Sequence, residues 1–239
     1  MEIIDANTMF GPWPRERADM SLDRLVSALS NRGVARAITL STTGIFHSYN
    51  DGNAETLEGC QGKSNLTPAA TIDPRGYFAG MNMTAKLVAQ GFKMFRFFPS
   101  EQGWPLDHAV FEDILDELEP TPTPIMINAS RTGDASALGR ILGGRQHPLI
   151  LEGVTFETLA EAVSVMKKHS NIYVETHGLI APGGIKFLAE QVGAERIVFG
   201  SDCPRSSLAG ALRLMNESGL SDEDKAKVFG GNIMRLLGG

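Results

Sequence analysis

The sequence predicts an α/β fold, a single (β/α)8 TIM barrel, and three observations lead to it. Short apolar runs alternate with longer amphipathic stretches along the chain, which is typical of parallel strands joined by helices. Eight such strand-helix units can be counted. The 239 residues are close to the roughly 250 of a typical barrel of this kind. We therefore expect one domain over residues 1–239, in a compact or distorted variant of the barrel.

Each predicted strand is a short apolar run bounded by Gly, Pro, Asn or Asp. In chain order the strands are expected at residues 2–6, 35–40, 66–72, 91–99, 125–128, 149–152, 172–175 and 196–199. An open, doubly wound sheet is the alternative arrangement, but no G-x-G-x-x-G motif follows the first strand.

Each predicted helix carries apolar residues at helical spacing, and the first one also has clear ends. Ser21 is a suitable N-cap, and Gly33 follows the last turn. Residues 41–53 are expected to form a long loop, and Pro120, Pro122 and Pro124 a rigid connector. The helices are expected at residues 21–32, 54–61, 77–90, 107–118, 136–142, 155–169, 185–192, 208–217 and 222–237.

The composition limits the partners. A net charge of −6 argues against a nucleic-acid surface, which would be basic. The sequence contains no apolar run of about 18 residues, so no membrane span is expected. No signal peptide is expected either. Cys60 and Cys203 are too few for a disulfide framework, which suits a reducing cytoplasm. We expect a cytoplasmic protein that binds a small molecule; a homo-oligomer stays open.

Asp202 is the most telling residue, because it directly follows the last predicted strand. Ile197 to Phe199 form a strand buried on both faces, and an acid at its carboxyl end would lie at the barrel mouth. An unpaired buried carboxylate is costly, so it needs a cation, a proton or hydrogen-bond donors. The alternative is structural: Asp202 caps the following turn or pairs with Arg205.

Motifs spread over nearly the whole chain carry a family likeness. They are I-D-A-N-T-M-F-G in the first strand, A-T-I-D-P-R in the third, G-F-K-M-F-R-F-F-P in the fourth, N-I-Y-V-E-T-H-G in the seventh, R-I-V-F-G-S-D-C-P in the eighth and G-G-N-I-M-R-L-L at the end. In these motifs the chain resembles the amidohydrolase superfamily, in its amidohydrolase-related (amidohydrolase 2) branch. The resemblance implies hydrolase or decarboxylase chemistry at a divalent cation, usually zinc, held by histidines and the eighth-strand acid.

The chain departs from that family pattern at most of the ligand positions. The H-x-H pair of the family reads Asn7-Thr8-Met9, and Asn128 and Glu152 stand where the family has histidines. Of the usual ligands only Asp202 remains, and this set does not suit zinc. We therefore expect no metal. A silent barrel and a rebuilt metal site that uses Asp202, Glu152, His177 and Asn7 stay open as alternatives.

The predicted site is assembled from the carboxyl ends of the strands. Asp202 is expected to act on water as a general base, assisted by His177 or Glu152. The residues expected to bind the substrate are Arg96, Asn128, Asn7, His47 and Trp13. The alternatives are an internal salt bridge of Arg96 with Glu152 or Asp202, a merely hydrogen-bonded His177, and core packing of Trp13.

The expected activity is hydrolysis of a small carboxylated or cyclic substrate, such as a lactone or an amide, without the usual metal. The resemblance provides a precedent, since some members of the family are thought to hydrolyse lactones without a cation. Two alternatives stay open: a catalytically silent barrel that binds a small molecule or a partner, and a metal-dependent hydrolase or decarboxylase with a rebuilt metal site.

Overall fold

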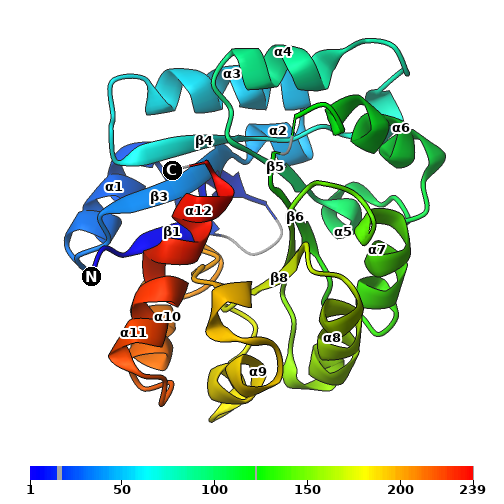
Figure 1. Cartoon of the computed structure of the whole chain (residues 1–239). Helices are drawn as coiled ribbons and strands as arrows, with labels where there is room; N and C mark the ends of the chain where they lie inside the picture. The colour runs from blue at the N-terminus through cyan, green and yellow to red at the C-terminus, as the bar shows by residue number, and fades with distance from the viewer. Residues whose placement is uncertain (15–17, 122, 239) are drawn as a thin grey trace.

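The computed structural model describes residues 1–14, 18–121 and 123–238, and shows a sheet curled into a barrel with helices outside it (Figure 1). Within this part of the chain one sheet has the strand order β2-β1-β3-β4-β5-β6-β7-β8-β9. The strands are β1 (Ile4–Trp13), β2 (Ala18–Met20), β3 (Arg36–Ser41), β4 (Leu66–Ala70), β5 (Met94–Phe97), β6 (Ile125–Asn128), β7 (Leu149–Glu152), β8 (Ile172–Glu175) and β9 (Ile197–Val198).

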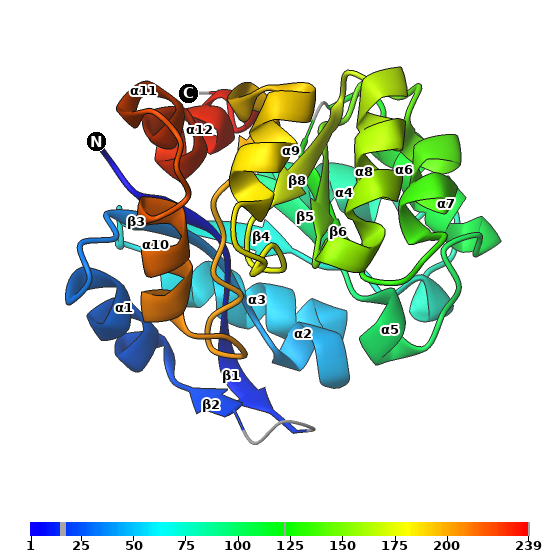
Figure 2. The ribbon, with the colours of Figure 1, turned by 90° about the horizontal axis from the view of Figure 1, so that it is seen from below.

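The helices follow the strands in alternation and cover the outside of the barrel (Figure 2). They are α1 (Leu22–Ser30), α2 (Thr43–Phe46), α3 (Tyr49–Cys60), α4 (Met83–Ala89), α5 (Pro99–Gln102), α6 (Ala109–Leu118), α7 (Asp134–Leu142), α8 (Phe156–Lys168), α9 (Gly184–Val192), α10 (Leu208–Asn216), α11 (Asp222–Ala226) and α12 (Asn232–Leu236). Short turns η1 (Pro74–Gly76), η2 (Ala194–Arg196) and η3 (Lys227–Gly231) complete the chain. None of the described helices is long and apolar enough to span a membrane.

The two ends of the sheet meet, which closes the barrel. The Ala6 amide donates to the Phe199 carbonyl at 3.0 Å, and the Met9 amide donates to the Cys203 carbonyl at 2.9 Å. Every pair from β1–β3 to β8–β9 is parallel, and only the β2 ribbon is antiparallel. The prediction of eight parallel strands in a barrel is confirmed for the described residues.

The first strand is longer than predicted. β1 does not turn away after residue 6 but continues to Trp13, because β2 pairs with its last three residues, Gly11 to Trp13. Its register against β3 shifts between Asp5 and Thr8, which is a β-bulge at the barrel seam.

Three helix predictions are wrong in extent. The expected loop at 41–53 contains α2 and the first residues of α3, whose N-cap Ser48 accepts the Asp51 amide. The helix expected from residue 77 begins at Met83, because Gly80 and Asn82 have left-handed backbones. The last predicted helix is interrupted by η3. Pro122 of the predicted connector lies outside the described residues.

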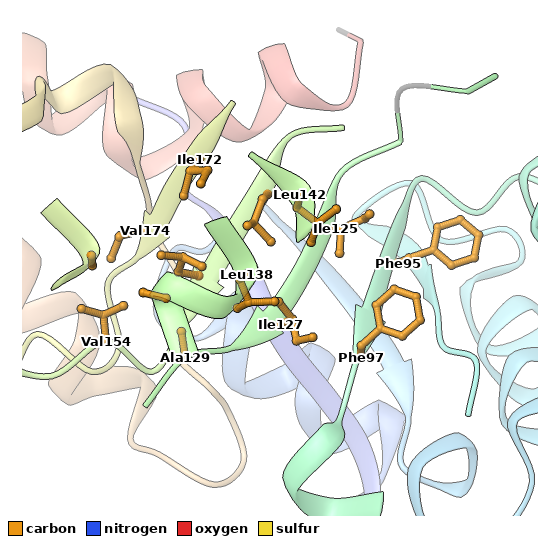
Figure 3. Packing of buried hydrophobic residues seen from close by; sticks show 14 of the residues in the cluster. Phe95, Phe97, Ile125, Ile127, Ala129, Leu138, Leu142, Val154, Ile172 and Val174 are labelled. Carbon is orange, nitrogen blue, oxygen red and sulfur yellow. The ribbon is translucent and has the colours of Figure 1, made fainter. Parts of the chain in front are cut away.

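Side chains alternate between two apolar layers along β5 to β8. Phe95, Phe97, Ile125 and Ile127 face the helices, where they belong to one cluster with Leu138 and Leu142 of α7 (Figure 3). The residues between them fill the barrel interior: Met94, Met126, Ile150 and Tyr173. Because side chains repeat every two residues on a strand, the next inward positions lie at the carboxyl ends. They are the polar residues Arg96, Asn128, Glu152 and Glu175.

Candidate active site

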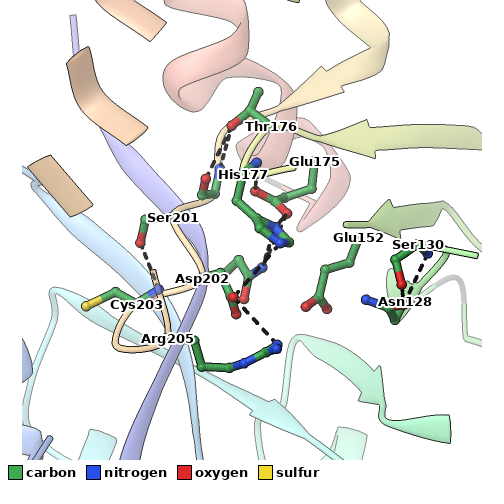
Figure 4. A network of polar contacts seen from close by, with 12 residues as sticks. Asn128, Ser130, Glu152, Glu175, Thr176, His177, Ser201, Asp202, Cys203 and Arg205 are labelled. Carbon is green, nitrogen blue, oxygen red and sulfur yellow. Dashed lines mark hydrogen bonds and ion pairs between the residues drawn. The ribbon is translucent and has the colours of Figure 1, made fainter. Parts of the chain in front are cut away.

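Polar side chains from β7, β8 and the turn after β9 converge at the carboxyl ends of the barrel (Figure 4), and Arg96 of β5 and Asn7 of β1 join them. Four of the predicted site residues lie in this cluster with close mutual contacts: Asp202, His177, Glu152 and Arg96. We call this group, together with Glu175, Asn7 and Arg205, the mouth cluster. It is deeply buried, so its charges act on one another with little screening by water.

Asp202 stands where the chain leaves β9, in a left-handed conformation with φ of 55°. Its side chain is nearly inaccessible, and one oxygen, Oδ1, has no hydrogen-bond partner. The other, Oδ2, lies 3.6 Å from the Arg205 guanidinium and 3.9 Å from Nε2 of His177. Burial, followed by the nearby charge of Glu152, raises the pKa of the Asp202 carboxyl to about 7. Asp202 can therefore donate or accept a proton near neutral pH.

His177 is held by the carboxylate two residues before it. Nδ1 of the ring forms an ion pair with Glu175 Oε2, and the His177 amide donates to Glu175 Oε1 at 2.7 Å. Burial alone would favour the neutral ring, but the charge of Glu175, with Asp202 and Glu152 behind it, raises the pKa of His177 to about 10. Asn7 donates to the same carboxylate at 3.3 Å. His177 is therefore a fixed cation beside Asp202.

Arg96 and Glu152 form a second ion pair inside the barrel. The guanidinium is 0 % exposed, and its Nη2 lies 3.1 Å from Glu152 Oε2. Nη1 donates to the Thr8 carbonyl at 3.3 Å, and the guanidinium lies 5.2 Å from the centre of the Phe98 ring. Burial opposes ionisation of Glu152, yet the charges of Arg96 and then His177 lower its pKa. Of the alternatives for Arg96, the internal salt bridge with Glu152 is the one present.

Arg205 forms the accessible rim of the cluster and packs on the buried Trp13. The Arg205 side chain is 25 % exposed, and its guanidinium stacks 4.6 Å from the centre of the Trp13 ring. Trp13 itself is buried and packs edge-on against Phe46 of α2 at 4.9 Å. The predicted contact between Asp202 and Arg205 exists, and it joins this rim to the buried carboxyl.

Two predicted substrate-binding residues lie apart from the mouth cluster. Asn128 pairs with Glu152 in the sheet register, but its Oδ1 accepts from the Ser130 amide and hydroxyl. It borders a depression of about 350 Å³ beside Trp104. His47 is exposed at the end of α2, next to a cleft of about 280 Å³ that it shares with the Asp73–Arg75 ion pair. Neither side chain has a described contact with Asp202.

Two acids near the site, Asp5 and Glu101, were not predicted from the sequence. Asp5 is fully buried on β1, where it accepts from the Ser201 amide at 3.0 Å and the Ser201 hydroxyl at 2.5 Å. Burial raises its pKa to about 7, against the effect of these hydrogen bonds. Glu101 of α5 is close enough to sense the charges of Glu152 and Arg205, and burial raises its pKa. The signal for Asp5 was present, since it is a carboxylate inside an apolar strand.

Solved structures with the same fold are found at low sequence identity. A dihydroxybenzoic acid decarboxylase from Polaromonas sp. JS666, with bound manganese and 2-nitroresorcinol, aligns with a TM-score of 0.77 and 15 % identity over 99 % of this chain and 97 % of that one. A TIM-barrel protein from Bordetella bronchiseptica gives 0.80 and 15 % over 100 % and 99 %. A 2,6-dihydroxybenzoate decarboxylase from Rhizobium gives 0.74 and 13 % over 100 % and 99 %. At these identities the similarity shows the fold.

The donor set of this chain does not fit a divalent cation. Among the described residues, no group of three or more His, Cys, Asp or Glu side chains is arranged to hold a metal ion. Nδ1 of His177 is paired with Glu175, so only Nε2 faces the rest of the cluster, at 3.9 Å from Asp202 Oδ2. The Glu152 carboxylate is already bound to the Arg96 guanidinium. The described residues therefore do not support the rebuilt site of Asp202, Glu152, His177 and Asn7.

The family of the chain is identified by a comparison of sequences. A search of curated proteins finds no match. The sequence profile of the amidohydrolase family, Amidohydro_2, matches residues 82–239, which is more than half of the chain. This match includes five strands, β5 to β9, and the turn that carries Asp202. The resemblance predicted from the motifs is confirmed: the chain belongs to the amidohydrolase family.

Proposed function

We propose that the chain is an enzyme that decarboxylates a small aromatic carboxylic acid, with Asp202 as the proton donor. The observation that carries the proposal is the state of Asp202: a buried carboxyl with a pKa of about 7, one free oxygen and a cation on either side. Carboxyls with raised pKa values in a polar site are typical of acid-base catalysts.

The reaction needs one proton at one carbon atom. The protonated Asp202 gives its proton to the ring carbon that bears the carboxylate. The bond from this carbon to the carboxylate then breaks, CO₂ leaves, and the ring carbon keeps the proton. The Asp202 carboxylate recovers a proton from solvent, which its pKa near 7 permits. His177 stays protonated and stabilises the Asp202 carboxylate that forms when the proton is transferred.

The rim offers the complementary binding groups. The Arg205 guanidinium is the most accessible cation of the mouth cluster, and it can form paired hydrogen bonds with a substrate carboxylate. Its stacking on the buried Trp13 ring holds the guanidinium in place. The two aromatic-acid decarboxylases of similar fold support this substrate class, although they share only 13–15 % of their residues with the chain.

Hydrolysis of a lactone or amide is the second candidate, because two buried oxygens of the site lack a hydrogen-bond donor. Oδ1 of Asp202 and Oδ1 of Asn7 are buried acceptors without partners, and a water molecule has two hydrogens to donate. In this reaction the ionised Asp202 takes the proton of a water that attacks the carbonyl carbon. The carbon–oxygen or carbon–nitrogen bond then breaks, and the leaving group takes a proton.

Turnover of a defined panel separates the candidates. Purified protein is incubated with 2,6-dihydroxybenzoate, other hydroxybenzoates and aromatic lactones, with and without added Mn²⁺, and CO₂ release and ring opening are followed. We expect CO₂ release that is lost in Asp202→Asn and kept in the control Asp113→Asn, an exposed residue of α6. Ring opening without CO₂ release would favour the second candidate. Binding without turnover of any compound would contradict both and support a silent barrel.

A further inference from the structure

A fully buried guanidinium is the least expected feature of the barrel interior. Arg96 is on the inward side of β5, between the apolar Met94 and the ring of Phe98. A buried charge is stable only if it is paired, and Glu152 supplies the pair. The Thr8 carbonyl accepts a further hydrogen bond, but Nε has no partner. Arg96 therefore uses part of its hydrogen-bonding capacity within the protein and keeps one buried donor unused.

The barrel mouth carries more acid than base, so a strong fixed cation is required there. Glu152, Glu175 and Asp202 are all buried, and Glu101 lies near enough to feel their charge. Converging buried carboxylates repel one another unless a cation lies between them. In the manganese-containing decarboxylase of similar fold, a divalent ion is bound. Among the described cationic side chains of the mouth cluster, Arg96 is the one that is completely enclosed.

We propose that the Arg96 guanidinium is a built-in cation that takes the place of a divalent ion at the barrel mouth. It holds the Glu152 carboxylate and leaves Nε as an unpaired buried donor. The inference rests on the proposed site but not on the proposed reaction, so it is tested without turnover.

Guanidinium and metal compete for the same carboxylate oxygen. A divalent ion bound to Oε2 of Glu152 would displace Nη2 of Arg96 from its 3.1 Å contact. The displaced guanidinium would remain in an apolar interior without an acid, which is among the most costly arrangements in a protein. Removal of the guanidinium should reverse this balance, because the freed carboxylate of Glu152, with the unpaired Oδ1 atoms of Asp202 and Asn7, provides oxygen donors of the kind that manganese prefers.

The first test uses the wild-type protein. Metal content is measured by elemental analysis, and thermal unfolding is followed with millimolar MnCl₂ and with EDTA. We expect no stoichiometric transition metal and no change in Tm with either reagent. One equivalent of a divalent metal whose removal lowers Tm, and whose binding is lost in Asp202→Asn, would overturn the proposal.

The second test uses matched variants of Arg96. Arg96→Met removes the charge at similar length, and we expect MnCl₂ to raise its Tm by about 5 °C. Arg96→Lys keeps a cation and should not respond to manganese. Arg196→Met is the control for loss of an arginine outside the mouth, because Arg196 donates to the Ile172 and His169 carbonyls.

Each outcome of the second test has a clear meaning. A manganese response confined to Arg96→Met supports the exchange of guanidinium for metal. A folded Arg96→Met protein that ignores manganese, or a response of the same size in Arg196→Met, contradicts it. If Arg96→Met does not fold, the wild-type measurements and Arg96→Lys still decide the question, since a manganese response in either protein contradicts the proposal.

Discussion

The two sides of the barrel mouth hold equally buried carboxylates in opposite states. On the β9 side Asp202 is 3 % exposed, and its pKa is raised to about 7. On the β5–β7 side Glu152 is 4 % exposed, and its pKa is lowered. Burial disfavours both ionised forms, so burial cannot be the source of the difference.

The difference lies in how close the nearest cation is and in the charge of the neighbouring acid. Glu152 contacts the buried Arg96 guanidinium at 3.1 Å. Asp202 has its two cations at 3.6 and 3.9 Å, feels the negative charge of Glu152, and leaves Oδ1 unpaired. The Glu152 carboxylate is stabilised as an ion by its close pair with Arg96, whereas the Asp202 carboxyl can still exchange a proton. The reactive carboxyl is thus the one that lacks a hydrogen bond at one oxygen and a close ion pair at the other.

Replacement of Asp202 by Asn should give the largest effect. We expect turnover to fall about 10²- to 10⁴-fold, the usual contribution of a general acid or base. Stability at pH 8 should rise, because the neutral amide does not have to be ionised in a buried site. Turnover is measured on the substrate found in the panel, and stability by urea unfolding. A destabilised variant, or unchanged turnover, would remove Asp202 from the reactive side.

Glu152→Gln should have the opposite effect on stability. It leaves the Arg96 guanidinium buried without its acid, and we expect a loss of about 3–5 kcal/mol in the free energy of unfolding. The control is Glu2→Gln, which breaks the exposed pair with Arg36 and should cost less than about 1 kcal/mol. Urea unfolding measures both. Equal losses in the two variants would show that the enclosed pair is no different from a surface pair.

Arg205→Met should mainly affect substrate binding. Loss of a charged hydrogen bond to an anionic substrate predicts a rise in KM of about tenfold or more, with a smaller change in kcat. Arg213→Met on α10 is the control, because its only described partner is the exposed Glu217. Steady-state kinetics distinguishes the two. A fall in kcat with constant KM would place Arg205 in the chemical step instead.

The last prediction concerns the pH dependence of stability. The pKa of Asp202 is raised from 3.8 to about 7, so its contribution to stability is full below pH 4 and is lost as the pH rises through about 7. Asp5 has the same sign and window. Urea unfolding between pH 5 and 8 should therefore show falling stability, and Asp202→Asn and Asp5→Asn should each flatten the curve. Curves parallel to that of the wild type would contradict the raised pKa values.

Much of the fold could be predicted from local patterns. Apolar runs such as Ile197 to Phe199 mark buried strands, and the order of the family motifs identifies the superfamily. Met94 and Arg96 stand two residues apart on one strand, as do Ile150 and Glu152 on another. Residues at this spacing lie on the same face, so each polar residue faces the interior with its apolar neighbour. The predictions failed where the backbone was decided by pairing or by left-handed residues, as in the extension of β1 by β2 and the late start of α4 at Met83.

The sequence could not predict which site residues pair with one another. Arg96 could have met Glu152 or Asp202, and only the closed barrel decides for Glu152. Asp5 and Ser201 are separated by 196 positions, yet the seam between β1 and the end of β9 brings them into hydrogen-bond contact. Asn128 and His47 were equally plausible as site residues, but their side chains are directed to local partners or to solvent.

The sequence by itself determined which residue types stand at the ends of the strands, and with them the family, the barrel and the presence of buried charge. The tertiary structure alone decided which charge meets which. Strand pattern depends on near neighbours along the chain, whereas a pKa depends on the few ångströms that separate side chains from distant strands.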